Sequence, residues 1–155
     1  MQIPFQIFHP DAKPPVYGSD GAAAADLCAI CPPEGIEISP GQRVLIPTGI
    51  GVELPQGYVG LVFARSSMGI KHGIALSNGV GVIDWDYRGA ISVGLVNLSD
   101  KSYRILPGER IAQLAVMPVC TPQFVEVQQL SQTERGQGGF GSTGRVELTT
   151  NEEIQ

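Results

Sequence analysis

Short runs of apolar and β-branched residues follow one another along the chain, and glycine or proline ends each run within a few positions. Some runs are continuously apolar, such as Val44-Leu45-Ile46, whereas Ile91-Ser92-Val93 alternates between apolar and polar positions. Neither pattern has the 3.6-residue period of a long helix. Many short strands separated by turn residues are typical of a β-sandwich or barrel. The predicted strands span residues 2–8, 35–38, 43–54, 58–63, 79–83, 90–97, 103–106, 109–118 and 123–127.

One segment, residues 66–72, is predicted to form a short helix with Ser66 as its N-cap. A chain of 155 residues is long enough for a single domain with a buried core. We expect residues 1–134 to form this β domain and residues 135–144 to form a separate glycine-rich segment. Residues 145–155 are polar and acidic with little to bury, which predicts a flexible tail.

Composition and charge narrow the class of protein. Hydrophobic residues make up 43% of the chain and charged residues 16%, which argues against disorder and suggests that some surface is buried in an oligomer. A net charge of −5 without a basic run predicts no nucleic-acid partner. No apolar stretch approaches the ~20 residues of a membrane span, which predicts no membrane partner. Three cysteines suit a reducing compartment, so we expect a soluble cytoplasmic protein.

The Cys28-x-x-Cys31 pair has the spacing of a metal or redox motif, but no second pair completes a zinc site. We therefore expect both cysteines to be small, partly apolar structural residues.

The glycine-rich segment places one aromatic ring, Phe140, among five glycines that include Gly141. Arg135 precedes the ring and the hydroxyl pair Ser142-Thr143 follows it. Exposed backbone N–H groups, a guanidinium and hydroxyls are suited to phosphate oxygens, and the ring is suited to a nucleobase. The alternative is a glycine-rich tail with one loosely packed phenylalanine.

Four further segments place polar residues where a plain strand would not need them. Arg65 and Ser66 follow a predicted strand and open the short helix, whose free N–H groups suit a phosphate. Asn78-Gly79 predicts a tight turn, and the Asn78 amide offers a donor and an acceptor to a base edge. The alternatives are that Ser66 is a helix cap beside a structural Arg65, and that the two carboxylates that follow Asn78 are turn residues or surface charges.

Three carboxylates and one amide are the remaining candidate site residues in these segments. Asp84 and Asp86 lie two positions apart near the second of these segments, so that one could face a site while the other pairs with an arginine. Gln113 is the polar residue of an apolar strand, so its amide needs a partner if it is buried. Asp26 stands among small residues and, taken alone, is best read as structural.

In their order and spacing, the five segments between Ala22 and Gly144 resemble the five motifs of the trimeric deoxyuridine triphosphatases (dUTPases). The resemblance implies an all-β, distorted jelly-roll or sandwich fold with one short helix, assembled as a homotrimer with active sites shared between subunits. It also implies Mg²⁺-dependent hydrolysis of dUTP to dUMP and pyrophosphate, an activity of nucleotide metabolism that keeps uracil out of DNA.

The resemblance also implies roles for individual residues. Asp84 would be the general base that activates water, and Asp26 would contact Mg²⁺ through metal-bound water. Tyr87 would pack on the deoxyribose and exclude a 2′-hydroxyl. The substrate would further be bound by residues that read uracil, grip phosphates or close over the site: Arg65, Ser66, Ser67, Asn78, Gly81, Val82, Gln113, Arg135, Phe140, Gly141, Ser142 and Thr143. The chain departs from the family pattern at Ala24, Ala25, Ser67 and Trp85.

Two alternative functions are open to a chain of this pattern. A related dCTP deaminase shares the Arg-Ser-Ser segment, but it relies on a glutamate in the strand after the third motif, where this chain has Gly94. A non-catalytic nucleotide-sensing or protein-binding module has no need for Asp84. Both comparisons favour the triphosphatase.

Overall fold

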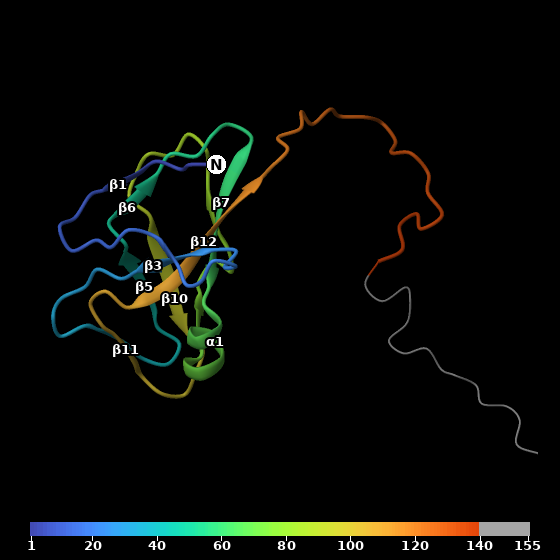
Figure 1. Ribbon diagram of the computed structural model, residues 1–155. Coiled ribbons are helices and arrows are strands. Elements are labelled where there is room, and N and C mark those ends of the chain that lie inside the picture. The colour runs from blue at the N-terminus through green and yellow to red at the C-terminus, as the bar shows by residue number, and fades with distance from the viewer. Residues whose placement is uncertain (140–155) are drawn as a thin grey trace, which may run out of the picture. The chain divides into compact units, whose positions relative to one another are not determined.

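The computed structural model describes residues 1–139, and its elements are short strands and one helix (Figure 1). All of them lie in the first of two units, Met1–Thr121, and the second unit begins at Pro122. The elements are β1 Phe5–Ile7, β2 Val16–Tyr17, β3 Ala25–Cys28, β4 Ile36–Ile38, β5 Arg43–Pro47, β6 Ile50–Val52, β7 Tyr58–Ala64, α1 Ser66–His72, β8 Ile74–Leu76, β9 Gly81–Ile83, β10 Ser92–Asn97, β11 Tyr103–Ile105 and β12 Arg110–Pro118.

Four antiparallel sheets build this unit. The largest has the order β2-β3-β12-β7-β9, a three-stranded sheet has the order β5-β10-β8, and β1-β6 and β11-β4 form pairs. One continuous core joins them, and isoleucines and leucines such as Leu27, Ile46 and Ile111 are almost completely buried in it. The prediction of an all-β sandwich with one short helix is therefore confirmed.

The predicted strand at residues 43–54 is two strands that belong to different sheets. Thr48 is buried between them and its hydroxyl donates to the carbonyl of Ile91 at 2.7 Å. Gly49 then turns the chain with a φ of 66°, a conformation that glycine adopts without steric cost. The apolar run continues across this turn, and for that reason the hydrophobic pattern alone predicts one strand.

Other strand predictions were incomplete. Strands β2, β3 and β8, which are two, four and three residues long, were not among the predicted strands. Residues 123–127 were predicted as a strand and form none, and Phe124 is 93% exposed. Apolar and β-branched residues favour a strand only where a neighbouring strand pairs with them.

The helix prediction is confirmed in its bounds, Ser66–His72, but wrong about the cap. Arg65 occupies the N-cap position with extended backbone, and Ser66 is the first helical residue. Within residues 1–139, no side chain makes a capping hydrogen bond to this helix. The Ser66 hydroxyl is therefore not needed to begin the helix.

Tyr103 connects the end of α1 to the turn between β11 and β12. Its hydroxyl donates a short hydrogen bond to Glu109, whose other carboxylate oxygen accepts the Leu106 N–H at 2.9 Å. Its ring lies 4.6 Å from the ring of His72, centroid to centroid. Burial, and then the hydrogen bond to Glu109, raise the pKa of Tyr103 above its usual range.

Replacing Tyr103 with phenylalanine is expected to lower the free energy of unfolding by roughly 1 kcal/mol at neutral pH, because one hydrogen bond to a carboxylate is lost. Since the folded-state pKa is raised, this contribution is present below the ordinary tyrosine pKa of about 10 and is lost as the pH rises further. Urea unfolding of both proteins across this pH range measures the difference. A difference independent of pH, or equal to that of Tyr17→Phe at an exposed tyrosine, would contradict the assignment.

Candidate active site

A buried carboxylate and two arginines form a connected pair of salt bridges. Asp26, on β3, is 9% exposed. Its Oδ1 lies 2.8 Å from Nε of Arg65, and its Oδ2 lies 3.1 Å from Nη1 of Arg110. Arg65 also donates from Nη1 to the backbone carbonyl of Arg110 at 3.1 Å. We call these three residues the Asp26 cluster; it joins β3, the start of α1 and the start of β12.

The Asp26 cluster carries one more positive than negative charge, so it suits an anion. Arg110 is the more accessible arginine, with a side chain 56% exposed against 26% for Arg65. Both arginines therefore combine an ion pair to Asp26 with a side chain that is partly exposed to solvent. An arginine held in this way is preorganised to bind phosphate oxygens.

A β-bulge explains why sequence reasoning missed Arg110. In a regular strand, residues three positions apart point to opposite faces, which would separate Arg110 from Gln113. Here Arg110 pairs with Cys28 and Gln113 with Asp26, because β12 contains one extra residue between them. The bulge brings both side chains to the face that carries Asp26. The sequence at the start of this strand, after Gly108, did not indicate the bulge.

Gln113 has the partner that its place in an apolar strand requires. Its Nε2 donates to the backbone carbonyl of Ala64 at 3.1 Å, directly before Arg65. Ser66 is exposed and Ser67 is half-buried in the first turn of α1. Two of the predicted phosphate-binding residues, Arg65 and Gln113, are therefore neighbours of Asp26, and Ser66 and Ser67 follow Arg65 directly in the chain.

The predicted base-reading turn has its own hollow. Asn78, Gly81 and Val82 help to line a cavity of about 150 Å³ together with residues of β10, including Ser92 and Gly94. The turn itself is closed by a hydrogen bond from the Val80 N–H to the carbonyl of Asn78 at 2.9 Å. The predicted tight turn at Asn78 is thus present, and it borders a space open to a flat ligand.

Asp84 and Tyr87 lie in one turn after β9. The Tyr87 N–H donates to the carbonyl of Asp84 at 3.2 Å, and the Tyr87 hydroxyl donates to the carbonyl of Ala90 at 3.2 Å. Asp84, Asp86 and Tyr87 are all exposed. The carboxylate that pairs with the nearby Arg88 is that of Glu53, and not Asp84 or Asp86 as the sequence suggested.

Strand register separates Asp84 from the Asp26 cluster within one copy of the chain. Ile83 pairs with Gly60, which places Asp84 opposite Val59. Arg65 stands six residues farther along the same strand direction, a distance of about 20 Å at the rise of an antiparallel strand. One copy therefore brings Asp84 together with Tyr87, and Asp26 together with Arg65 and Gln113, but it does not bring these two groups together.

Comparisons with known proteins show which family the chain belongs to. The family model described as dUTPase matches residues 11–144. A deoxyuridine 5'-triphosphate nucleotidohydrolase of Roseobacter denitrificans is 48% identical, over 84% of this chain and 86% of the relative. One from a Hydrogenobaculum species is 45% identical, over 93% and 99%. The dUTPase of Staphylococcus bacteriophage 80alpha, solved with dUPNHPP, has a TM-score of 0.84 and 28% identity, over 93% and 99%.

The chain belongs to the dUTPase family. The match to solved dUTPases confirms the predicted jelly-roll architecture of this dUTPase. Its activity is that of a dUTP diphosphatase. The protein therefore hydrolyses dUTP, and the two alternatives, deamination of dCTP and binding without catalysis, are not its function.

The second unit of the dUTPase carries Arg135, the only predicted residue of the fifth motif within residues 1–139. Its Nε donates to the carbonyl of Gly138 at 2.9 Å, and the Gly138 N–H donates back to the carbonyl of Arg135 at 2.9 Å. In this turn the Arg135 guanidinium contacts the backbone of the same segment. Phe140, Gly141, Ser142 and Thr143 lie outside the described residues.

Residues 1–139 of the dUTPase contain neither a cluster of metal-binding side chains nor a membrane-spanning helix. This part of the chain has no group of three or more His, Cys, Asp or Glu side chains that could hold a metal ion. Burial raises the pKa of the Cys28 and Cys31 thiols, which disfavours the thiolate that a metal needs. Nor does this part hold a helix that is long and apolar enough to cross a membrane.

Proposed function

We propose that this dUTPase hydrolyses dUTP by attack of water on the α-phosphorus, with the Asp84 carboxylate taking the proton from that water. The bond between the α-phosphorus and the bridging oxygen then breaks, releasing pyrophosphate and leaving dUMP. The position of Asp84 supports this role: it is exposed at the end of β9, in the turn that also presents Tyr87. General-base catalysis requires a carboxylate that water can reach.

Selectivity for deoxyuridine is assigned to the turn after β8 and to Tyr87. Asn78, with the backbone of Gly81 and Val82, would hydrogen bond to uracil in the cavity that these residues line. A site matched to uracil leaves polar groups unpaired against cytosine, which is a strong basis for discrimination. The Tyr87 ring would pack on the deoxyribose and leave no room for a 2′-hydroxyl.

The triphosphate is assigned to the residues around the Asp26 cluster. Arg65, Ser66, Ser67 and Gln113 would contact its phosphates, and the excess positive charge of the cluster supports this assignment. Arg135 of the second unit, with Phe140, Gly141, Ser142 and Thr143, would grip the γ-phosphate and close over uracil. Displacement at phosphorus depends on such positioning and charge neutralisation more than on covalent help.

The donor set near Asp26 fits Mg²⁺ held mainly by the substrate. Asp26 is a single carboxylate, and both of its oxygens already accept arginine N–H groups. Mg²⁺ keeps several waters and binds through substrate phosphates more readily than through an all-protein cage. Asp26 would therefore contact the water shell of the ion. When bound, Mg²⁺ neutralises phosphate charge at the reacting centre.

We further infer a homotrimer whose active sites are shared between subunits. The separation of about 20 Å between Asp84 and Arg65 along β7 supports this inference, because one copy cannot apply both to one α-phosphate. A second copy would supply the phosphate-binding group, in agreement with the family resemblance. A cytoplasmic location is proposed from the odd number of cysteines, three, in the sequence.

Attack at the α-phosphorus is tested with isotopically labelled water. The labelled oxygen is expected in dUMP and not in pyrophosphate, because the new bond forms at the α-phosphorus. Mass spectrometry of the products measures it, and dCTP, dTTP and UTP supplied in parallel measure selectivity. Label in pyrophosphate, or release of orthophosphate, would place the attack at another phosphorus and overturn the assignment.

A further inference from the structure

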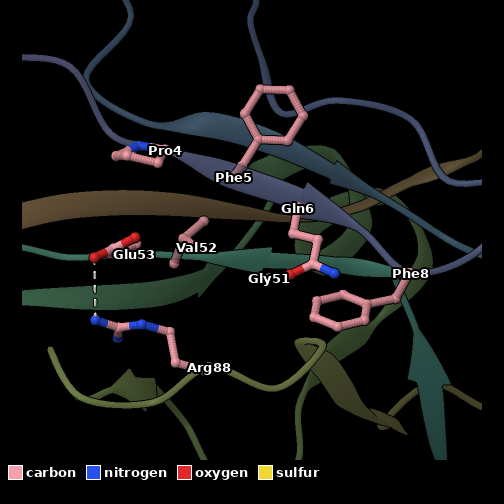
Figure 2. Close-up of a pocket in the computed structure, with 8 residues that line it drawn as sticks. All are labelled: Pro4, Phe5, Gln6, Phe8, Gly51, Val52, Glu53 and Arg88. Atoms are coloured by element: carbon pink, nitrogen blue, oxygen red, sulfur yellow. Dashed lines mark hydrogen bonds and ion pairs between the residues drawn. The ribbon is translucent and has the colours of Figure 1, made fainter.

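Arg88 makes three contacts with the backbone and side chains around the Asp84 turn. Its Nη1 donates to the carbonyl of Trp85 at 2.7 Å and to the carbonyl of Tyr87 at 3.1 Å. Its Nη2 donates to Oε1 of Glu53 at 3.4 Å. Figure 2 shows the Arg88–Glu53 pair at one side of a cavity of about 250 Å³. None of these contacts is part of the function proposed above.

Glu53 belongs to a firmly held part of the sheet structure. It follows β6 directly, its own N–H donates to the carbonyl of Pro4 at 2.9 Å, and β6 pairs with β1 along its length. The turn from Asp84 to Tyr87, by contrast, is closed by one backbone hydrogen bond of 3.2 Å. Arg88 therefore adds a side-chain link between this turn and the end of β6.

We propose that Arg88 is a positioning residue that holds the Asp84 turn in the geometry needed for catalysis. The inference rests on the proposed roles of Asp84 and Tyr87. A planar guanidinium is suited to this task because its N–H groups point to several acceptors at once. The Arg88 guanidinium donates to two backbone carbonyls of the turn and to the carboxylate of Glu53. Trp85, which is larger than the small residue usual at this position in the family, contributes its backbone carbonyl to this arrangement.

The contacts of Gly89 and Ala90 extend the same arrangement to the Tyr87 ring. A Cβ at residue 89 would overlap the Tyr87 hydroxyl, so the ring lies against the backbone of Gly89. The hydroxyl donates to the carbonyl of Ala90. Because Arg88 stands between Tyr87 and these residues, a shift of the turn would move Asp84 and the sugar-facing ring together.

The contacts of Arg88 are expected to affect local opening of the turn more than the global stability of the protein. The Arg88–Glu53 pair is half-exposed, and an exposed ion pair contributes little to global stability. Hydrogen bonds from a charged donor to two carbonyls do oppose local opening of the turn. Loss of Arg88 is therefore expected to appear in catalysis and selectivity rather than in the unfolding temperature.

The experiment compares Arg88→Met, Arg88→Lys and the matched control Arg104→Met. Arg104 is also 50% exposed, binds a carboxylate (Glu37, 2.9 Å) and a carbonyl (Glu34, 3.0 Å), and lies on β11. For Arg88→Met we expect kcat with dUTP to fall by about 10- to 100-fold, since a displacement near 1 Å has effects of that order. The preference for dUTP over UTP should fall as well, because Tyr87 moves.

Rescue and control variants decide the result. Arg88→Lys keeps a cation that reaches the carbonyls, so its kcat is expected between those of the wild type and Arg88→Met. Arg104→Met is expected to leave kcat and selectivity unchanged. Equal kinetics for Arg88→Met and Arg104→Met would overturn the inference, and so would a loss explained entirely by a lower unfolding temperature. Failure of the proposed function is distinguished by Asp84→Asn, whose retained turnover would remove the base role whatever Arg88 does.

Discussion

Asp84→Asn is expected to lower kcat by roughly 10³-fold, the range typical of losing a general base. Asparagine has nearly the same shape as aspartate, but its amide neither carries charge nor accepts a proton from water at neutral pH. Since Asp84 is exposed, the exchange leaves the core and the unfolding temperature unchanged. Pyrophosphate release measures turnover, and calorimetry with a non-hydrolysable dUTP analogue measures binding, which should persist.

Asp86→Asn is the matched control for this substitution. Asp86 is an exposed carboxylate two residues farther along the same turn, so it experiences the same local charge and solvent. Its replacement is expected to change kcat by less than about 3-fold, as for a surface charge without contact to the reacting atoms. Equal losses in the two variants would show that net charge in the turn, and not a base at Asp84, matters for turnover.

Mixing two inactive variants is expected to restore activity if active sites are shared between subunits. Asp84→Asn removes the base, and Arg65→Met removes a phosphate contact of the Asp26 cluster. After the two proteins are unfolded and refolded together in equal amounts, one site in four combines an intact Asp84 turn with an intact Arg65. The mixture should therefore show about a quarter of wild-type activity. Steady-state pyrophosphate release measures it.

A second mixture tests whether the recovered activity comes from sharing. Asp84 and Tyr87 lie in one turn of one copy, so each site receives both from the same subunit. Asp84→Asn mixed with Tyr87→Ala is therefore expected to give no more activity than the two variants measured separately. Recovery in this control, or none in the first mixture, would contradict a site shared in this way.

Much of the fold follows from local pattern. Alternating apolar positions and turn residues identify most strands, and the predicted bounds of the helix, residues 66–72, are correct although Ser66 is not its cap. Local pattern does not indicate where an apolar run changes sheet, and Thr48 is an example, because its partner Ile91 is 43 residues away. Nor does it indicate that residues 123–127 have no paired neighbour in the described part of the chain.

The candidate site divides in the same way. Residue type draws attention to Gln113, an amide in an apolar strand, and to Arg65 before the helix, whereas a role for Asp26 was expected only from the family resemblance. The placement of Arg110 beside Asp26 depends on the bulge in β12, and the Arg88–Glu53 pair joins residues 35 positions apart in the sequence. Such contacts depend on register and tertiary approach, which no window of local sequence contains. The structure therefore adds the residues that hold the site in place to those that carry its chemistry.

The bulge in β12 also has a consequence for changes in chain length. With the extra residue between them, Arg110 and Gln113 both lie on the face of Asp26. Deleting the extra residue would restore a regular strand and leave Arg110 and Gln113 two positions apart, so both side chains would still lie on the face of Asp26. The bulge thus accommodates a difference of one residue in the length of β12, so related sequences could lack the extra residue and still place an arginine beside Asp26.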